Sequence, residues 1–164
     1  MMNKLKLYIE STIPSYITAR DSRYALRLTR QFITRAFWEN ERNRFEIFTS
    51  QTVLDECKRG DQDAAIRRIQ IIKEIELLEE TDQAMELSLF YRQLLGIPGR
   101  AKDDAMHLAL CVVHEIDLLL TWNCAHLGPV AQKRMQTYND KHDLWTPILV
   151  TPETINEIIS KEAP

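Results

Sequence analysis

The sequence has few of the residues that form linkers, disulfide frameworks or metal cages. It contains four glycines and six prolines among 164 residues, too few for a long flexible linker, and it shows no internal repeat. Its three cysteines are odd in number and widely spaced, without a Cys-x-x-Cys pair. This argues against both a disulfide framework and a zinc cage. We therefore expect the reducing compartment of the cytoplasm.

Long apolar runs are also missing. The longest, residues 108–113, is far too short to span a bilayer, and the start MMNKLKLYIE reaches Glu10 before a signal-peptide core forms. We expect a protein that is not exported and that does not contact a membrane.

Positive charge is concentrated in one region of an otherwise acidic chain. A net charge of −3 disfavours indiscriminate binding to nucleic acid. Residues 20–44, however, contain seven arginines and only three acidic residues. Arg23, Arg27 and Arg30 form one stripe of a helix expected over 22–38, where Tyr24 and Phe32 recur at helical spacing. The stripe is either a guide for a phosphate backbone or a plain solvated face.

Strand and helix patterns alternate along the whole chain. Strands are expected over 4–10, 45–49, 76–80, 118–121 and 148–150, and further helices from Gln51, over 64–75 and 81–95, from Asp103, over 129–138 and from Thr151. This order predicts an α/β fold, a single domain over 1–160 with a small, mostly parallel sheet between helices. Residues 161–164 are expected to be a flexible tail.

The stretch 103–126 carries most of the functional information. Asp103 and Asp104 open a helix whose apolar residues follow the spacing of a buried face, namely Ala105, Leu108, Ala109 and Val112. The apolar strand over 118–121 then stops at Trp122 and Asn123, as a buried strand does at the rim of its sheet. Ligands of open α/β sheets bind at that rim.

Oxygen ligands recur at the strand ends and at the starts of the following helices. They are Glu10, Glu56, Asp104 and Asn123. Parallel crossovers bring such positions to one edge, where hard oxygen donors suit Mg²⁺ or Mn²⁺ and the hydrolysis of a phosphodiester. Each residue also has a plain explanation by itself. Glu10 can serve a helix dipole, Glu56 can pair with a neighbouring Lys58 or Arg59, and Asn123 can close a turn.

His107 is three residues after Asp104 and four after Asp103, so one helical face can hold an imidazole with a carboxylate. A core or supporting histidine is favoured over a metal ligand. A transition-metal set made of His107, His114 and His126 is disfavoured because no cysteine or HxxxH pattern supports it. For Trp122, packing at the sheet edge is favoured over stacking on a base.

Four motifs, in this order and spacing, resemble a known family. They are LYIESTIPSY, SQTVLDE, DAMHLAL and DLLLTWNCAHL, and together they cover most of the chain. The sequence resembles the PIN-domain nucleases, most closely the VapC-like toxins of toxin–antitoxin pairs. That family has a small parallel sheet between helices, in agreement with the fold expected from the patterns.

The resemblance implies a Mg²⁺- or Mn²⁺-dependent endoribonuclease with a small antitoxin as partner, and we also expect a homodimer. It places Glu10, Glu56, Asp104 and Asn123 on the four metal positions, and Ser11 or Thr12 on an accompanying hydroxyl. The first and fourth positions are commonly aspartate in the family. Glu10 is one methylene longer and Asn123 is neutral, so the alternative is a PIN-like module with weakened chemistry that binds RNA or protein.

Overall fold

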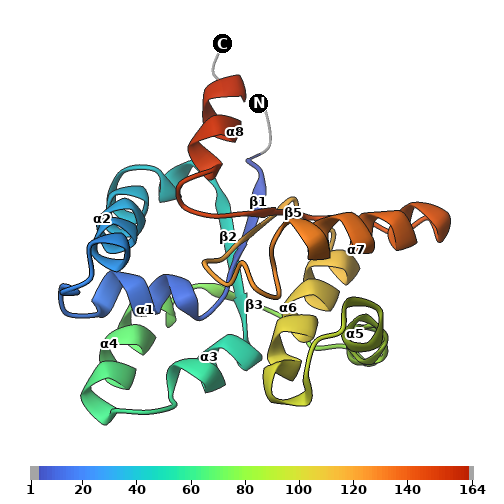
Figure 1. Ribbon diagram of the computed structural model, residues 1–164, viewed down its shortest axis with the longest axis horizontal. Coiled ribbons are helices and arrows are strands. Elements are labelled where there is room, and N and C mark those ends of the chain that lie inside the picture. The colour runs from blue at the N-terminus through green and yellow to red at the C-terminus, as the bar shows by residue number, and fades with distance from the viewer. Residues whose placement is uncertain (1–3, 163–164) are drawn as a thin grey trace.

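The computed structural model describes residues 4–162, and within them five strands form one sheet in the order β3-β2-β1-β4-β5 (Figure 1). The strands are β1 (Lys6–Ile9), β2 (Glu46–Ser50), β3 (Glu76–Leu78), β4 (Leu118–Leu120) and β5 (Ile148–Val150). All four pairings are parallel, with Leu7 of β1 opposite Ile47 of β2 and Leu118 of β4. The prediction of an α/β domain with a small sheet between helices is confirmed.

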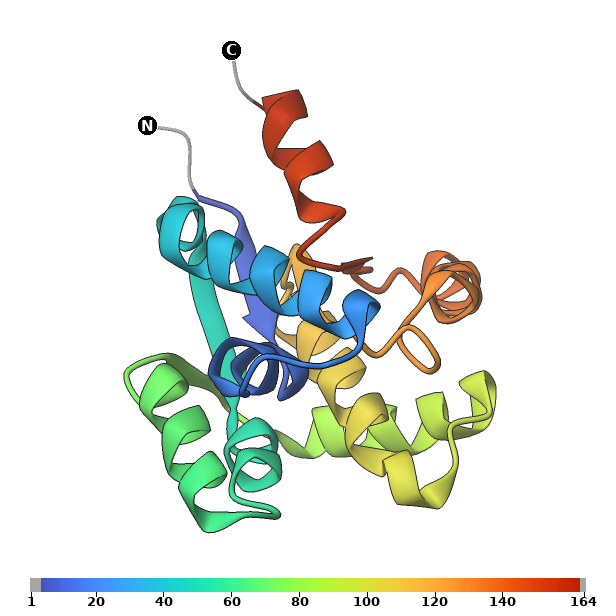
Figure 2. The same cartoon turned by 60° about the vertical axis from the view of Figure 1, so that its left-hand side comes forward.

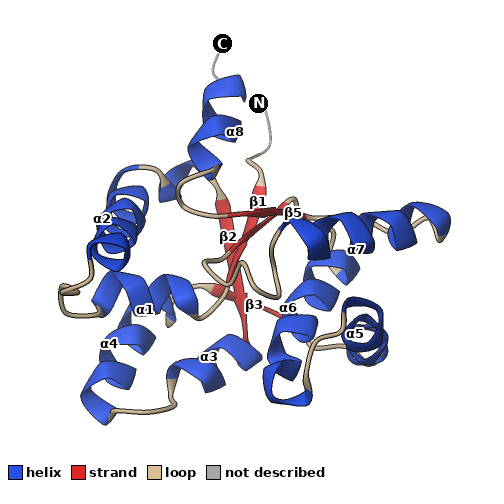
Figure 3. Ribbon diagram, in the orientation of Figure 1, coloured by secondary structure: helices blue, strands red, loops and turns tan. Residues whose placement is uncertain are grey.

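Helices cover both faces of the sheet (Figures 1, 2 and 3). Helices α1 and α2 lie on one side, and α5, α6 and α7 lie on the other. The helices are α1 (Thr12–Thr18), α2 (Ala25–Asn40), α3 (Gln51–Cys57), α4 (Gln62–Ile72), α5 (Asp82–Leu95), α6 (Lys102–Val113), α7 (Pro129–Lys141) and α8 (Ile155–Glu162), with short 3-10 turns at Arg42–Arg44 and Gly99–Ala101. In this part of the chain, no helix is both long and apolar enough to cross a membrane. The end of the expected tail, 163–164, lies outside the described residues.

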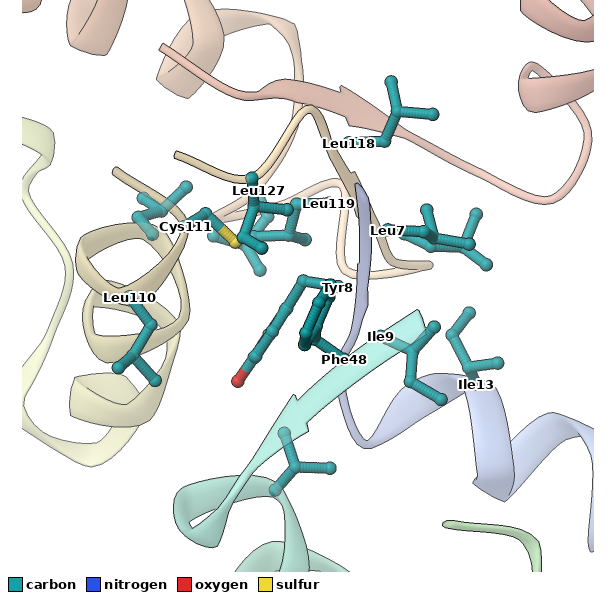
Figure 4. Packing of buried hydrophobic residues seen from close by; sticks show 14 of the residues in the cluster. Leu7, Tyr8, Ile9, Ile13, Phe48, Leu110, Cys111, Leu118, Leu119 and Leu127 are labelled. Carbon is teal, nitrogen blue, oxygen red and sulfur yellow. The ribbon is translucent and has the colours of Figure 1, made fainter. Parts of the chain in front are cut away.

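The central strand β1 is buried on both faces. Leu7, Tyr8 and Ile9 are all fully buried, because β1 lies between β2 and β4 and the sheet is covered by helices on each side. Tyr8 is therefore as inaccessible as its apolar neighbours Leu7 and Ile9, although its position alternates with theirs along the strand. Figure 4 shows its ring extending from β1 toward α6.

Capping residues set several helix ends as the sequence predicts. The side chain of Ser50 accepts a hydrogen bond from Val53 N at the start of α3, and Thr81 does the same for Ala84 N at the start of α5. Gly96, with φ +67°, ends α5 in the left-handed conformation. The expected buried face of α6 is confirmed at all four of its apolar positions, Ala105, Leu108, Ala109 and Val112.

Local hydrogen bonds shift three helix starts from the predicted positions. Ser22 is held in the loop before α2, where its N donates to Gln31 Oε1, so α2 starts later than residue 22. Asp61 caps α4 through Ala64 N, which starts that helix earlier. Before α8, Thr154 N donates to Thr151 Oγ1, so the helix begins only at Ile155.

Candidate metal centre

Segments that follow three strands meet at the carboxyl edge of the sheet (Figure 1). Glu10 follows β1 directly, Glu56 lies in the second turn of α3 after β2, and Asn123 follows β4. Asp104 lies in the first turn of α6, which packs against α3. All four predicted ligands are therefore on elements that begin or end at this edge.

His107 of α6 joins these segments from the inside. It is fully buried, and its Nε2–H donates to Glu56 Oε2 at 2.9 Å. Burial lowers the pKa of His107. The hydrogen bond to Glu56 and the negative charges of Glu56, Glu10 and Asp104 raise it by more than burial lowers it, so the pKa lies above its ordinary value. The charges of all three carboxylates thus raise the pKa of the same imidazole, which shows that the three lie around it.

Tyr8 and Ser50 fix the other side of the imidazole. The Tyr8 hydroxyl lies 2.8 Å from His107 Nδ1 and 2.8 Å from Ser50 Oγ. Burial raises the pKa of Tyr8 well above its ordinary value, so its hydroxyl stays neutral. This chain of hydrogen bonds holds the His107 ring in one orientation, and through it the carboxylate of Glu56.

Sequence reasoning missed the role of Tyr8. A tyrosine within an otherwise apolar central strand needs a buried polar partner for its hydroxyl. This need was the available signal, and His107 is one of the polar side chains that meet it.

Glu10 is a buried carboxyl group beside this network. It is 2% exposed, and Oε1 accepts hydrogen bonds from Thr12 N at 3.1 Å and from Thr12 Oγ1. Burial raises the pKa of Glu10 to about 7, against the lowering effect of His107 and Thr12. Thr12 Oγ1 also accepts from Trp122 N at 3.0 Å. Of the two candidate hydroxyls, Thr12 rather than Ser11 contacts the carboxylate.

The raised pKa of Glu10 predicts an unusual pH dependence for the metal-free protein. Because the folded pKa, about 7, exceeds the ordinary value of 4.5, the contribution of Glu10 to stability is fully present below 4.5 and is lost as the pH rises through 7. The loss is at most about 3 kcal/mol. Denaturant unfolding in chelator at several pH values should show that Glu10→Gln removes this part of the slope.

The raised pKa of His107 acts in the same direction and owes part of its rise to Glu10, so the difference between the two slopes reports Glu10 together with its coupling to His107. Identical slopes in the two proteins would contradict the assignment to Glu10.

Asp104 is held by a histidine that the sequence did not assign to it. His126 Nδ1–H donates to Asp104 Oδ2 at 2.6 Å, and the Asp104 side chain is 11% exposed. His114 lies elsewhere, bonded to the carbonyl of Glu79. The favoured expectation of a core or supporting histidine is confirmed for His107, which is fully buried and bonds Glu56 rather than a carboxylate of its own helix; Asp103 pairs with Arg59 at 2.9 Å. His107 points into the protein, where α3 supplies its partner.

The loop after β4 is closed by its own backbone. Leu127 N donates to Asn123 O at 2.8 Å, and His126 N lies 3.4 Å from Asn123 Oδ1. Asn123 is half-buried and shapes the segment that carries His126. Gly128 ends the loop, and a Cβ there would lie only 2.3 Å from Cys124 O. The position therefore requires glycine because of close contact.

Gly128→Ala is expected to destabilise the fold by about 1–3 kcal/mol, because the added methyl forces the loop backbone to move. Denaturant unfolding measures the loss. Gly99→Ala is the matched control, since its added Cβ would meet only the end of the Arg92 side chain at 3.4 Å. Equal effects of the two substitutions would show that the loop accommodates the methyl.

Arginines and aromatic rings flank this loop. Arg30 Cζ lies 4.9 Å from the centre of the Trp122 ring, and Arg27 Cζ lies 5.9 Å from that of Tyr16, which stacks on Trp122. Trp122 is 6% exposed and donates to Thr34 Oγ1, so the expectation that it packs at the sheet edge is confirmed. Two arginines of the α2 stripe are thus beside the acidic edge.

The donor atoms suit a divalent cation. Glu10, Glu56 and Asp104 each use one oxygen in a hydrogen bond within the protein, and the second oxygen of each makes none with residues 4–162. Ligating carboxylates are commonly held by outer hydrogen bonds in this way, and an all-oxygen set fits Mg²⁺ or Mn²⁺. Within the described range, however, no three His, Cys, Asp or Glu side chains already form a ligand group. Binding therefore requires the carboxylates to turn toward one another.

Comparison with known proteins adds no relative. No family model matches the chain, and no curated protein is significantly similar to it.

Proposed function

We propose that this protein is a Mg²⁺- or Mn²⁺-dependent endoribonuclease of the PIN-like type, the VapC-like toxin of a toxin–antitoxin pair. The observation that carries the proposal is the set of three carboxylates at the carboxyl edge of a parallel sheet. Each of them is fixed by one oxygen, to Thr12, His107 or His126, while its other oxygen makes no hydrogen bond with residues 4–162. The motif resemblance supplies the reaction class.

Glu10, Glu56 and Asp104, with the carbonyl oxygen of Asn123, are the proposed ligands. Divalent ions bound there would supply Lewis-acid stabilisation and an activated water for hydrolysis of the phosphodiester. The surrounding residues orient the ligands. Thr12 fixes Glu10, His107 fixes Glu56 and His126 fixes Asp104.

Two of the three arginines of the expected stripe, Arg27 and Arg30, lie on α2 and are the proposed guide for the RNA backbone, whereas Arg23 lies before the helix. Arg27 and Arg30 lie beside the loop that carries Asn123, and both stay free of ion pairs with residues 4–162. Arg35, in contrast, is structural, since it pairs with Asp21 and donates to Ala19 O and Ile17 O. Only part of the positive charge in this region is therefore available to a phosphate backbone.

The proposed partner is a small antitoxin that inserts an arginine into the acidic edge, as a guanidinium pairs well with carboxylates. The proposed setting is the cytoplasm, where the free thiols of Cys57, Cys111 and Cys124 stay reduced. A homodimer stays a prediction. Activity assays with proteins that co-purify with the chain, or that are encoded beside it, test the antitoxin, and an unchanged activity in every case would count against it.

The deciding experiment is incubation of the purified chain with structured RNA while Mg²⁺ or Mn²⁺ is titrated, with a chelator control. Metal-dependent cleavage supports the ribonuclease. Binding of RNA without cleavage at any metal concentration would favour the alternative, a PIN-like module with weakened chemistry, to which the neutral Asn123 points.

A further inference from the structure

A pocket on the flank of the acidic edge is lined by positive charge. It has a volume of about 350 Å³ and lies between α3, α5 and the start of α6. Its polar lining consists of Thr52, Ser88, Arg92, Lys102 and Asp103. Asp103 is already paired with Arg59, while Arg92 and Lys102 make no ion pair with residues 4–162. The pocket therefore keeps a net positive charge.

Arg92 is the unusual member of this lining. Its Nε is shielded from solvent and has no hydrogen-bond partner in the described part of the chain. Gly99 borders the guanidinium, since a Cβ at that position would lie 3.4 Å from Arg92 Nη2. A buried donor on a charged group is costly when unpaired, and nearly all such groups in folded proteins have a partner. Because this Nε is shielded, an anion in the pocket can pair with it only if the guanidinium turns toward the pocket, and the unpaired donor favours that turn.

The chemistry of the lining selects a phosphate. A guanidinium offers paired N–H groups that match two phosphate oxygens, and Lys102 adds a point charge. The first turn of α6, a twelve-residue helix, begins at Lys102 and adds the positive end of its dipole. Leu89 and Met85, 60% and 43% exposed, provide an apolar rim for a ribose or base.

The pocket and the candidate metal centre share two helices, α3 and α6. Thr52 lies one helical turn before Glu56 on α3, and Lys102 lies two residues before Asp104 on α6. An RNA strand whose scissile phosphate is at the carboxylates would therefore reach the pocket by running along the starts of α3 and α6. This reasoning rests on the proposed ribonuclease function. We propose that the pocket binds a backbone phosphate of the RNA strand beside the cleavage point and sets the register of the strand.

The test measures binding of a short fluorescent RNA and of inorganic phosphate to the full chain. Glu56→Gln serves as the background for RNA, so that the probe stays intact. Arg92→Gln should weaken RNA binding about tenfold or more and lower the slope of log K against log salt by about 0.7, the value for one phosphate of a single strand. Arg67→Gln is the control, because it removes one exposed positive charge from α4, away from the pocket.

Inorganic phosphate separates the pocket from the enzyme activity. Phosphate should raise the melting temperature of the wild type and of Arg67→Gln, and not that of Arg92→Gln. Arg92→Lys should restore only part of the effect, because it keeps the charge and loses the paired donors. If RNA stays uncut while the rise in melting temperature caused by phosphate still depends on Arg92, the pocket binds phosphate and the ribonuclease proposal fails.

Two outcomes would overturn the pocket. One is that Arg92→Gln and Arg67→Gln bind RNA and phosphate equally well. The other is that phosphate raises the melting temperature of Arg92→Gln as much as that of the wild type.

Discussion

Glu56→Gln is expected to reduce metal-dependent RNA cleavage by well over the ~10–100-fold that loss of an outer-shell partner costs, because it removes a charged ligand itself. The fold should be preserved. The side-chain carbonyl of glutamine can still accept the hydrogen bond from His107 Nε2, which Glu56 Oε2 accepts at 2.9 Å. Asp104→Asn should behave in the same way, since its remaining oxygen can accept from His126 Nδ1.

The choice of the amide variants matters because His107 is fully buried. Glu56→Ala would leave its Nε2 without a partner at a cost of about 1–3 kcal/mol, so a loss of cleavage would mix chemistry with stability. Asp55→Asn is the matched control. It neutralises the neighbouring carboxylate, which is exposed and, within residues 4–162, pairs with Lys58 and Gln51 alone.

Cleavage rates at saturating metal, together with denaturant unfolding of each variant, decide the question. The Asp55→Asn rate should stay within about fivefold of wild type, because an exposed ion pair contributes little. Normal cleavage by both Glu56→Gln and Asp104→Asn would place the chemistry elsewhere on the molecule.

The positions of the acidic residues could be predicted because they depend on local pattern. Glu10 and Asn123 follow apolar strands, and Glu56 and Asp104 lie in the second and first turns of helices that start at the same edge, where all the parallel strands end. The order of elements likewise gave the α/β class. These features follow from the apolar period and the capping residues, which are properties of neighbouring positions in the chain.

The partners of the acidic residues could not be predicted, because they come from elements far apart in the sequence. Glu56 and His107 are 51 residues apart, and Tyr8 and His107 are 99 apart. From neighbouring positions alone, the possible partners of His107 were the carboxylates of its own helix. Those of Glu56 were the lysine and the arginine that follow it in the sequence. The actual pairing depends on how α3 and α6 pack at the sheet edge, which helical periodicity does not specify.

In α2, the sequence pattern predicted the helix correctly but not which of its faces is buried. Its four-residue recurrence of apolar side chains predicted a helix and the helix exists, but Tyr24 and Phe32 are 78% and 55% exposed. The buried positions of α2 are instead Gln31, Thr34, Phe37 and Trp38. Gln31 and Thr34 are buried because they bond the Arg20 carbonyl, Ser22 N and the Trp122 indole. A polar side chain with a tertiary partner can outweigh an apolar one in the choice of the inner face.

Asn123→Asp is expected to tighten the binding of Mg²⁺ or Mn²⁺ and to raise cleavage. The substitution costs little locally, because Asn123 Oδ1 is the atom near His126 N, at 3.4 Å, and an aspartate oxygen can take its place. It adds one negative charge beside the proposed ligands. At an effective dielectric near ~20, a charge a few ångströms from a metal ion is worth on the order of a few kcal/mol before desolvation is subtracted.

A second consequence of Asn123→Asp appears without metal. A fourth carboxylate at this edge repels Glu10, whose pKa is already raised to about 7, so the metal-free variant should be less stable than the wild type at neutral pH and regain stability when metal is added. Asn156→Asp, which adds the same charge at an exposed position of α8, should do neither. If Asn123 only closes the loop after β4, aspartate at that position will leave metal affinity unchanged. Calorimetric metal titration of the three proteins at matched pH and ionic strength separates the two cases, and equal affinities would remove Asn123 from the metal site.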